Sequence, residues 1–334
     1  GEVVFNTGMV GYYESLTDPS YAGQILACTY PLIGNYGVPQ DKKNGLGNFF
    51  ESHKIQAQSL VVSDYSYRFN HFDAKKSLSE WLVEEKIPAI TGIDTRALTK
   101  KLREKGTMLG KIIVNNEETE LFDPNNHNIV ETVSTKKEII YGGKNTGPKI
   151  ILQDCGVKNN IIRSLVSRNC VVTRVPFDFD FFGKGLEFDG VVVSNGPGDP
   201  KQCTETISII KKVLQKEIPL FGICLGNQLL ALAAGADTFK LKYGHRGQNQ
   251  PCRIVGTQKC FVTSQNHGFA VNTQTLSSEW KPWFYNLNDD TNEGIIHKSK
   301  PFMSVQFHPE ACPGPTDTGF LFDEFLAKIK AAKK

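Results

Sequence analysis

The stretch that most constrains the fold is an apolar run that ends at a cysteine and continues into a helical pattern. Residues 219–223 have the composition of a buried strand, and leucines at helical spacing follow Cys224. Gly222 and Gly226 stand two positions to either side of the cysteine, where a sharp turn tolerates no bulk. This pattern predicts a nucleophile elbow, with the thiolate favoured by the N-terminus of the following helix. A core cysteine at the end of a buried strand is the alternative.

The elbow belongs to a C-terminal half in which strands and helices alternate. Apolar runs with strand character occupy residues 149–153, 171–175, 190–194 and 219–223. Helical patterns occupy residues 159–167 and 204–216. Such alternation is typical of an α/β fold with a mostly parallel central sheet flanked by helices. A strand-rich part follows residue 237, and residues 317–334 are predicted to form a closing amphipathic helix.

The N-terminal half has a different, β-rich pattern. Short strands are predicted at residues 3–5, 24–30, 57–62 and 109–114, among many turn-forming residues. Two helices are predicted at residues 77–86 and 95–105, the second capped by Asp94 and stopped by Gly106. Residues 134–149 are rich in glycine and lysine and are interpreted as a linker. We therefore predict two domains, residues 1–140 and residues 149–334.

Composition narrows the class of protein and its partners. The 334 residues suffice for two cores, and 40% are hydrophobic. The net charge of +3 is too small to indicate binding to nucleic acid or to a membrane surface, and no apolar run is long enough to span a bilayer. The eight cysteines form no C-x-x-C pair, which argues against a metal site and for reduced thiols in a cytoplasmic protein. Because the chain begins at Gly1, we expect a fragment or a processed chain, and a mitochondrial location stays open.

A cysteine nucleophile needs a base and a group that orients the base. His308 follows an apolar run, and Glu310 comes two residues later, beyond a proline. Residues i and i+2 share a side of an extended chain, so Glu310 can hold the imidazole in the required tautomer. The sequence therefore predicts a triad of Cys224, His308 and Glu310, with a surface turn at residues 308–310 as the alternative. Donors for an oxyanion are expected from the backbone N–H of Leu225 and from residues 195–198.

Four motifs in this order resemble the class I, triad-type glutamine amidotransferases. They are Ser194-Asn-Gly-Pro-Gly-Asp-Pro200, Gly222-Ile-Cys-Leu-Gly226, Gln265-Asn-His-Gly-Phe269 and Gln306-Phe-His-Pro-Glu310. The N-terminal half is similar to the domain unique to the glutaminase part of carbamoyl-phosphate synthetases. That similarity is carried by Gly1-Glu-Val-Val-Phe-Asn-Thr-Gly8, Leu16-Thr-Asp-Pro-Ser-Tyr21 and Ile93-Asp-Thr-Arg96. The resemblance implies a small-chain N-terminal domain of mixed, β-rich α/β structure, followed by a class I glutamine amidotransferase domain.

The same resemblance implies a reaction. Cys224 would attack the side-chain amide carbon of glutamine, His308 would pass the thiol proton to the leaving ammonia, and water would cleave the thioester. The family's glutamine contacts fall on Ser20, Gly196, Gly198, Leu225, Gln228, Asn266, Gly268 and Phe269. Ammonia would pass to a synthetase large subunit or fused region that uses bicarbonate, ATP and Mg, in either pyrimidine or arginine biosynthesis. This chain has no G-x-x-x-x-G-K-[ST] loop, so we expect no cofactor of its own.

One position departs from the family pattern. Asn227 stands where glutamine-using synthetases of this kind usually have histidine. Ammonia-dependent relatives, by the same resemblance, lack the nucleophile, which this chain keeps as Cys224. We therefore predict an active glutaminase, with an altered rate or altered coupling. Two other interpretations stay open here, a cysteine peptidase or γ-glutamyl hydrolase on a related fold, and a catalytically silent docking or regulatory module.

Overall fold

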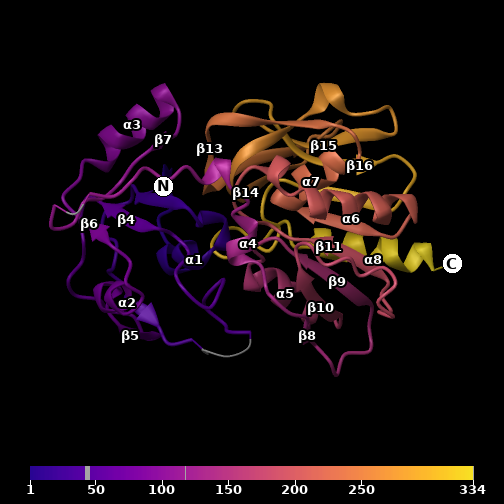
Figure 1. The fold of residues 1–334 in the computed structure, drawn as a ribbon, viewed down its shortest axis with the longest axis horizontal. Coiled ribbons are helices and arrows are strands. Elements are labelled where there is room, and N and C mark those ends of the chain that lie inside the picture. The colour runs from indigo at the N-terminus through magenta and orange to yellow at the C-terminus, as the bar shows by residue number, and fades with distance from the viewer. Residues whose placement is uncertain (42–45, 117, 334) are drawn as a thin grey trace.

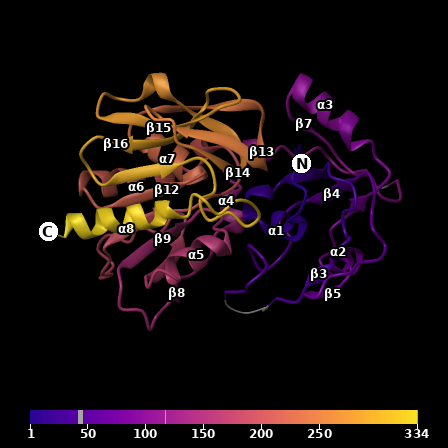
Figure 2. The ribbon, with the colours of Figure 1, turned by 180° about the vertical axis from the view of Figure 1, so that it is seen from behind.

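A computed structural model describes residues 1–41, 46–116 and 118–333 of the chain (Figure 1). Two sheets with separate cores lie side by side, and Figure 2 shows the same arrangement from behind. The helices of the described residues are too short or too polar to span a lipid bilayer.

The sheet of the N-terminal half has five strands among the described residues, in the order β6-β4-β2-β1-β7. Their bounds are β1 Glu2–Asn6, β2 Gln24–Cys28, β4 Ser59–Val62, β6 Ala89–Ile90 and β7 Met108–Leu109. All neighbours run parallel except β7, which is antiparallel to β1. A smaller sheet pairs β3 Val38–Pro39 with β5 Ala74–Lys76. The predicted β-rich character of this half is confirmed.

Helices of the N-terminal half are set by their caps. They are α1 Tyr12–Thr17, α2 Leu78–Glu84 and α3 Thr95–Lys105. The carboxylate of Asp94 accepts the backbone N–H of Ala97 at 2.8 Å, and Gly106 ends α3 with φ 93°. Both features were predicted from the sequence. The strand predicted at residues 109–114 is wrong beyond Leu109, because the residues that follow pair with no strand of the described chain, and Ile113 and Val114 are about half exposed.

The sheet of the C-terminal half has ten strands among the described residues, in the order β14-β13-β15-β16-β17-β12-β11-β9-β10-β8. Five central strands are parallel, namely β10 Val171–Pro176, β9 Lys149–Asp154, β11 Gly190–Val193, β12 Leu220–Ile223 and β17 Phe302–Val305. The flanking strands are antiparallel, namely β8 Ile139–Tyr141, β13 Asp237–Ile254, β14 Cys260–Asn272, β15 Trp280–Asn286 and β16 Asn292–His297. This confirms the predicted parallel core and the strand-rich part after residue 237.

Helices cover both faces of this sheet, as predicted. They are α4 Val130–Val133, α5 Asn159–Val166, α6 Thr204–Gln215, α7 Leu225–Ala233 and α8 Phe320–Ala332. In β9, Ile151 packs in the core that includes α6 and α7, whereas Ile150 and Leu152 pack in the core that includes α5 and α8. The period of two along each strand thus divides its side chains between two apolar layers. The closing helix begins three residues later than predicted, after a turn that ends at Gly319.

The linker prediction for residues 134–149 needs one correction. Residues 139–141 form β8, which pairs antiparallel with residues 172–174 of β10. Because β8 supplies hydrogen bonds to an otherwise open edge of the sheet, a segment with two isoleucines is held there despite its glycine-rich surroundings. The division into residues 1–140 and 149–334 stays a prediction.

Candidate active site

The elbow is built as the sequence predicts. Cys224 lies between β12 and α7 with φ 55° and ψ −103°, a conformation that is costly for any residue other than glycine. A Cβ atom on Gly222 would lie 2.4 Å from the carbonyl oxygen of Gly226, and one on Gly226 would lie 2.2 Å from the carbonyl oxygen of Val193. Both glycines are therefore required by close backbone contacts. The strained residue is the one that carries the thiol, and it stands at the carboxyl end of a parallel strand.

The thiol of Cys224 has two polar neighbours. Its Sγ donates to the carbonyl oxygen of Asn266 at 3.7 Å and accepts from Nε2 of Gln306 at 3.7 Å. Only 2% of Cys224 is exposed. The sulfur is thus held in a polar, nearly dry environment, which separates it from the inert core cysteine of the alternative interpretation.

His308 and Glu310 form a buried pair beside Cys224. Nδ1 of His308 lies 2.6 Å from Oε1 of Glu310. Burial alone would lower the pKa of His308, but the Glu310 carboxylate more than offsets burial and raises it, with a further contribution from Cys224. Nε2 of His308 is buried and has no hydrogen-bond partner among the described residues. The free ring nitrogen is the one that a triad would use, and the Cys224 thiol is close enough to the ring to raise the pKa of His308.

A third buried residue, Lys158, contacts this pair and was not predicted from the sequence. Its Nζ lies 3.1 Å from Oε1 of Glu310 and donates to the carbonyl oxygen of Ala311 at 2.5 Å. Burial alone would raise the pKa of Glu310, but Lys158 and His308 together lower it to about 2. Glu310 is therefore an anion at neutral pH. The one signal in the sequence was a lysine shortly after the end of a buried strand, which is too common to indicate a role.

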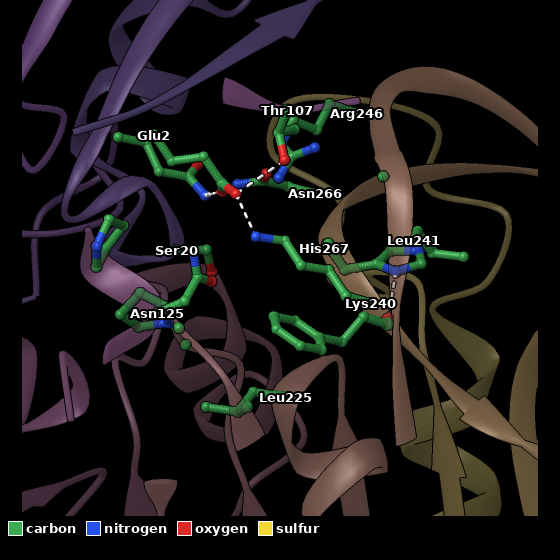
Figure 3. Close-up of a pocket in the computed structure, with 18 of the residues that line it drawn as sticks. Glu2, Ser20, Thr107, Asn125, Leu225, Lys240, Leu241, Arg246, Asn266 and His267 are labelled. Atoms are coloured by element: carbon green, nitrogen blue, oxygen red, sulfur yellow. Dashed lines mark hydrogen bonds and ion pairs between the residues drawn. The ribbon is translucent and has the colours of Figure 1, made fainter. Parts of the chain in front are cut away.

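A pocket opens over Cys224 and is lined by both halves of the chain (Figure 3). The eight residues that the family resemblance placed around glutamine all line it, namely Ser20, Gly196, Gly198, Leu225, Gln228, Asn266, Gly268 and Phe269. Their roles stay predictions, but their convergence is a fact of the structure. The lining also includes charged side chains that the sequence did not single out, Glu2, Lys240 and Arg246.

Ser20 belongs to the N-terminal half, and buried hydrogen bonds hold it in the lining of this pocket. Nδ2 of Asn195 donates to Oγ of Ser20 at 2.9 Å, and Nδ2 of Asn266 donates to Asp18 at 3.2 Å. Asp18 also accepts the backbone N–H of Ser20 at 2.9 Å and so caps the short helical turn Pro19–Tyr21. In the loop after Asn195, a Cβ atom on Gly196 would lie 2.0 Å from the carbonyl oxygen of Cys155. The two halves therefore meet where the parallel strands end, through polar groups that hydrogen-bond to one another.

Asn227 lies behind the nucleophile in a chain of side-chain amides. Its Nδ2 donates to Oε1 of Gln306 at 3.0 Å, and its Oδ1 accepts from Oγ of Ser304 at 2.8 Å. Gln228 donates to the same oxygen of Gln306 at 3.1 Å and to the carbonyl oxygen of Phe269 at 2.9 Å. Because both donors hold Oε1, Nε2 of Gln306 is turned toward Cys224. The unusual asparagine is thus part of the support for the thiol.

A buried charge network lies next to the pocket and was not predicted from the spacing of the histidines. His245, His267 and Glu293 place three ligand-type atoms within 4.8 Å of one another, an arrangement that can hold a metal ion. The four ring nitrogens all have hydrogen-bond partners: Glu293 and Asp289 for His245, and Phe269 and Gln265 for His267. The spacing of cysteine and histidine in the sequence argues against a metal site, but these side chains come together only in the fold.

The charge on His245 predicts a pH dependence of stability. Burial alone would lower the pKa of His245, but Asp289 and Glu293 raise it from 6.5 to about 9. A raised pKa in the folded state contributes stability below pH 6.5, and this contribution is lost as the pH rises through about 9. We expect the free energy of unfolding, measured by denaturant titration, to fall over this range by at most about 3.4 kcal/mol. His245→Asn should flatten that pH dependence, and an equally steep fall in this variant would contradict the assignment.

Comparison with known proteins agrees with this geometry. The family model for glutamine amidotransferase class-I matches residues 151–328, and the model for the carbamoyl-phosphate synthase small chain, CPSase domain, matches residues 1–112. A crystal structure of a proposed GMP synthase subunit from Thermoplasma acidophilum covers 56% of this chain and 96% of its own, with a TM-score of 0.50 and 22% identity. That likeness shows the fold alone.

Relatives from several organisms match the chain over its whole length. It is 54% identical to the multifunctional protein CAD of Squalus acanthias and covers 15% of that protein. It is 50% identical to the carbamoyl phosphate synthase arginine-specific small chain of Aspergillus fumigatus and covers 75% of it. It is also 50% identical to the mitochondrial carbamoyl-phosphate synthase [ammonia] of Aquarana catesbeiana and covers 22% of it. With one family model over more than half of its residues and a relative that is 50% identical and covered to 75%, the chain belongs to the carbamoyl-phosphate synthase small-chain family and carries a class-I glutamine amidotransferase domain.

Proposed function

We propose that the chain hydrolyses glutamine to glutamate and ammonia through a thioester on Cys224. The observation that carries this proposal is the convergence of a strained cysteine, a histidine–carboxylate pair and eight family positions for glutamine in and beside one pocket. An amide carbon held above Cys224 would be attacked by its sulfur. The elbow supports this step because it presents the thiol at the start of α7, where the helix dipole favours negative charge.

The proton transfers follow from the free nitrogen of His308. As the C–S bond forms, the thiol proton moves to Nε2, and His308 then gives it to the amide nitrogen as the C–N bond breaks and ammonia leaves. Water next attacks the thioester, its proton passes to His308, and the C–S bond breaks to return Cys224 and release glutamate. The Glu310 anion stabilises the imidazolium that forms twice in this cycle. Backbone N–H groups of Gly196 and Leu225 are the proposed oxyanion donors, each worth about 10²–10³ in rate.

A second polar cavity suggests where the ammonia goes. It shares Asn266 with the lining of the glutamine pocket and is also lined by His308, Lys158, Asp18 and other polar groups. A polar lining suits a small molecule that needs hydrogen bonds along its path. We propose that ammonia leaves through this cavity toward a synthetase large subunit or a fused synthetase region. Bicarbonate, ATP and Mg would be bound there, as the family resemblance implies.

Labelling with an electrophilic glutamine analogue tests the proposed function. A diazoketone analogue of glutamine should modify Cys224 in the full-length protein with its synthetase partner or fused region, and glutamine should protect against modification. Glutamate release from glutamine should be lost in step with labelling. A silent docking module would give neither labelling nor glutamate release, and a peptidase would be protected by peptides better than by glutamine.

Asn227 gives a prediction about the support of the thiol. Asn227→Leu is expected to lower glutamine hydrolysis about tenfold, because a buried amide link worth about 1–3 kcal/mol no longer holds Gln306 toward the sulfur. Asn227→His should keep most of the activity, since an imidazole N–H can donate to the same oxygen. Initial rates of glutamate release at saturating glutamine measure both variants. Equal rates for the leucine variant and the wild type would show that this amide chain plays no part.

A further inference from the structure

A buried cluster of two histidines and a glutamate lies beside the glutamine pocket. His245 on β13, His267 on β14 and Glu293 on β16 place three ligand-type atoms within 4.8 Å of one another. Their side chains are at most 8% exposed. The proposed chemistry at Cys224 uses none of the three, so the cluster needs its own explanation.

The surroundings of His267 fix the proton on its ring. Nδ1 lies 2.8 Å from the carbonyl oxygen of Phe269, which can only accept a hydrogen bond, so Nδ1 carries the proton. A second proton would put a charge on a buried ring that packs against His245, with ring centroids 4.9 Å apart, and such a charge is unfavourable. The ring is therefore neutral, and its Nε2 is an acceptor.

Nε2 of His267 points at atoms that are acceptors as well. It lies 3.1 Å from Oε1 of Gln265 and 3.9 Å from Oε1 of Glu293. The amide of Gln265 cannot be reversed, because Oγ1 of Thr263 donates its proton to the carbonyl oxygen of Gln250 at 2.9 Å. Thr263 must then accept from Nε2 of Gln265, at 3.1 Å. Electron-rich atoms at these distances repel one another unless a positive charge lies between them.

The far side of each ring is held in the way that metal-binding histidines are held. Nε2 of His245 lies 2.8 Å from the carboxylate of Asp289, and Nδ1 of His267 donates to the carbonyl oxygen of Phe269. A histidine that binds a metal almost always donates its other N–H to a carboxylate or a backbone carbonyl. The two remaining ring nitrogens both face Oε1 of Glu293, at 3.3 and 3.9 Å. Both rings are thus oriented toward the same point.

We propose that His245, His267 and Glu293 form a binding site for a divalent metal ion of the zinc type. Two imidazoles and one carboxylate are a ligand set typical of zinc, whereas magnesium and calcium prefer oxygen ligands. Zinc–ligand distances of about 2.0–2.2 Å place the ligand atoms of a tetrahedral site roughly 3.4 Å apart, so the cluster needs only a small contraction. Oε1 of Gln265 is close enough to supply a fourth ligand.

The charges of the cluster suit a divalent ion. Bound between Nδ1 of His245 and Oε1 of Glu293, it would replace the proton that joins these two atoms. Its two positive charges would balance the carboxylates of Glu293 and Asp289. The side chain of Asp289 is 40% exposed, so the path of the ion from the surface to the cluster leads past this residue.

The ion would join three strands, because β13, β14 and β16 each supply one ligand. His267 also lies between Asn266 and Gly268 in the lining of the glutamine pocket (Figure 3). We therefore expect the ion to be structural and to hold this part of the lining in place. It takes no part in the steps at Cys224, so the inference goes beyond the proposed function and does not depend on it.

The test counts the zinc bound per chain by equilibrium dialysis with Zn²⁺, in the full-length protein with its synthetase partner or fused region. The parent protein carries Cys224→Ser, because a reactive thiol beside His308 also takes up zinc. Added to this parent, Glu293→Gln and His245→Gln should each remove one equivalent of bound zinc. The matched control is His297→Asn, a buried histidine of β16 outside the cluster, which should bind as much zinc as the parent. Comparison with the parent cancels zinc bound elsewhere in the protein.

Asp289→Asn tests the carboxylate behind His245. This variant should keep the equivalent at saturation but lower its affinity for zinc about 10- to 100-fold, because asparagine supports the ring less well than a carboxylate. Asp289 lies at the surface, so its substitution decides the question if the buried substitutions prevent folding. An affinity for zinc equal to that of the parent would in that case overturn the inference.

Cobalt(II) reports on the ligands of the site. Bound to the parent, it should give the visible absorption of a four-coordinate ion, which Zn²⁺ should remove by displacing it. An excess of Mg²⁺ should leave this absorption unchanged, because the ligand set is poor for a cation that prefers oxygen. Equal zinc binding by the parent, Glu293→Gln and His245→Gln would overturn the inference, and so would the same cobalt spectrum in Glu293→Gln and the parent.

Discussion

Cys224→Ser is expected to abolish glutamine-dependent carbamoyl phosphate synthesis while ammonia-dependent synthesis by the same complex continues. Serine fits the elbow, because the Cβ and the strained backbone stay the same and only the sulfur is replaced. Its hydroxyl loses a proton far less readily than a thiol and is therefore a far weaker nucleophile. Loss of a hydrolase nucleophile typically costs on the order of 10⁶ in kcat, so glutamate release should fall below detection. Ammonia supplied in solution bypasses this step.

The matched control for this prediction is Cys260→Ser. Cys260 is an exposed free cysteine at the start of β14, outside the pocket lining, and its replacement should change neither activity. Glutamate release and carbamoyl phosphate formation are measured with glutamine and with an ammonium salt. Retained glutamine hydrolysis in Cys224→Ser would sink the assignment of the nucleophile. Loss of ammonia-dependent synthesis would show that the substitution disturbs the partner and not only the thiol.

Local patterns made the geometry around Cys224 predictable. Residues 222–226 are enough to predict the elbow, because the strained turn between its strand and its helix needs glycine on both sides of the nucleophile. His308 and Glu310 are two residues apart, and their contact follows from the geometry of an extended chain. Asp94 and Gly106 predicted both ends of α3 for the same reason, since a cap acts within one helical turn.

Contacts between distant residues were not predictable in this way. Lys240 and Glu2 are 238 positions apart, and Ser20 and Asn195 are 175 apart. Nothing in a single sequence links such pairs, because they meet only after two sheets have formed and docked. The same holds for β8, which exists because the edge of β10 is open to it, and for residues 110–114, whose β-prone side chains found no partner strand.

Asn227 shows both what the sequence could predict and what it could not. Comparison with the family pattern identified Asn227 as unusual. Its hydrogen bonds to Gln306 and Ser304 could not be predicted, because these residues become neighbours only in the fold. An asparagine can donate and accept at once, and here it uses one atom for each. A departure from a motif therefore does not by itself mean lost function, since a different polar residue can supply the same donor.

His308→Asn is expected to lower glutamine hydrolysis about 10²–10⁴-fold, the range typical of a lost general base. Asparagine has no basic nitrogen to accept the thiol proton or to deliver it to ammonia. The Glu310 anion keeps its contact with Lys158, so the buried carboxylate is not left without a partner. We therefore expect the variant to fold and to sustain ammonia-dependent synthesis. Steady-state glutamate release at saturating glutamine measures the loss.

The rate of alkylation of Cys224 by a small neutral electrophile separates activation of the thiol from substrate binding. Because the imidazolium of His308 stabilises a neighbouring thiolate, His308→Asn should slow this alkylation at neutral pH. Raising the pH should bring the variant back toward the wild-type rate, since hydroxide then removes the proton that His308 no longer takes. Glu310→Gln should slow alkylation less, because it leaves the imidazole in place and removes only the charge that stabilises its protonated form. Equal alkylation rates in His308→Asn and the wild type at neutral pH would place the base elsewhere, because a nitrogen that does not affect the thiol cannot be its proton acceptor.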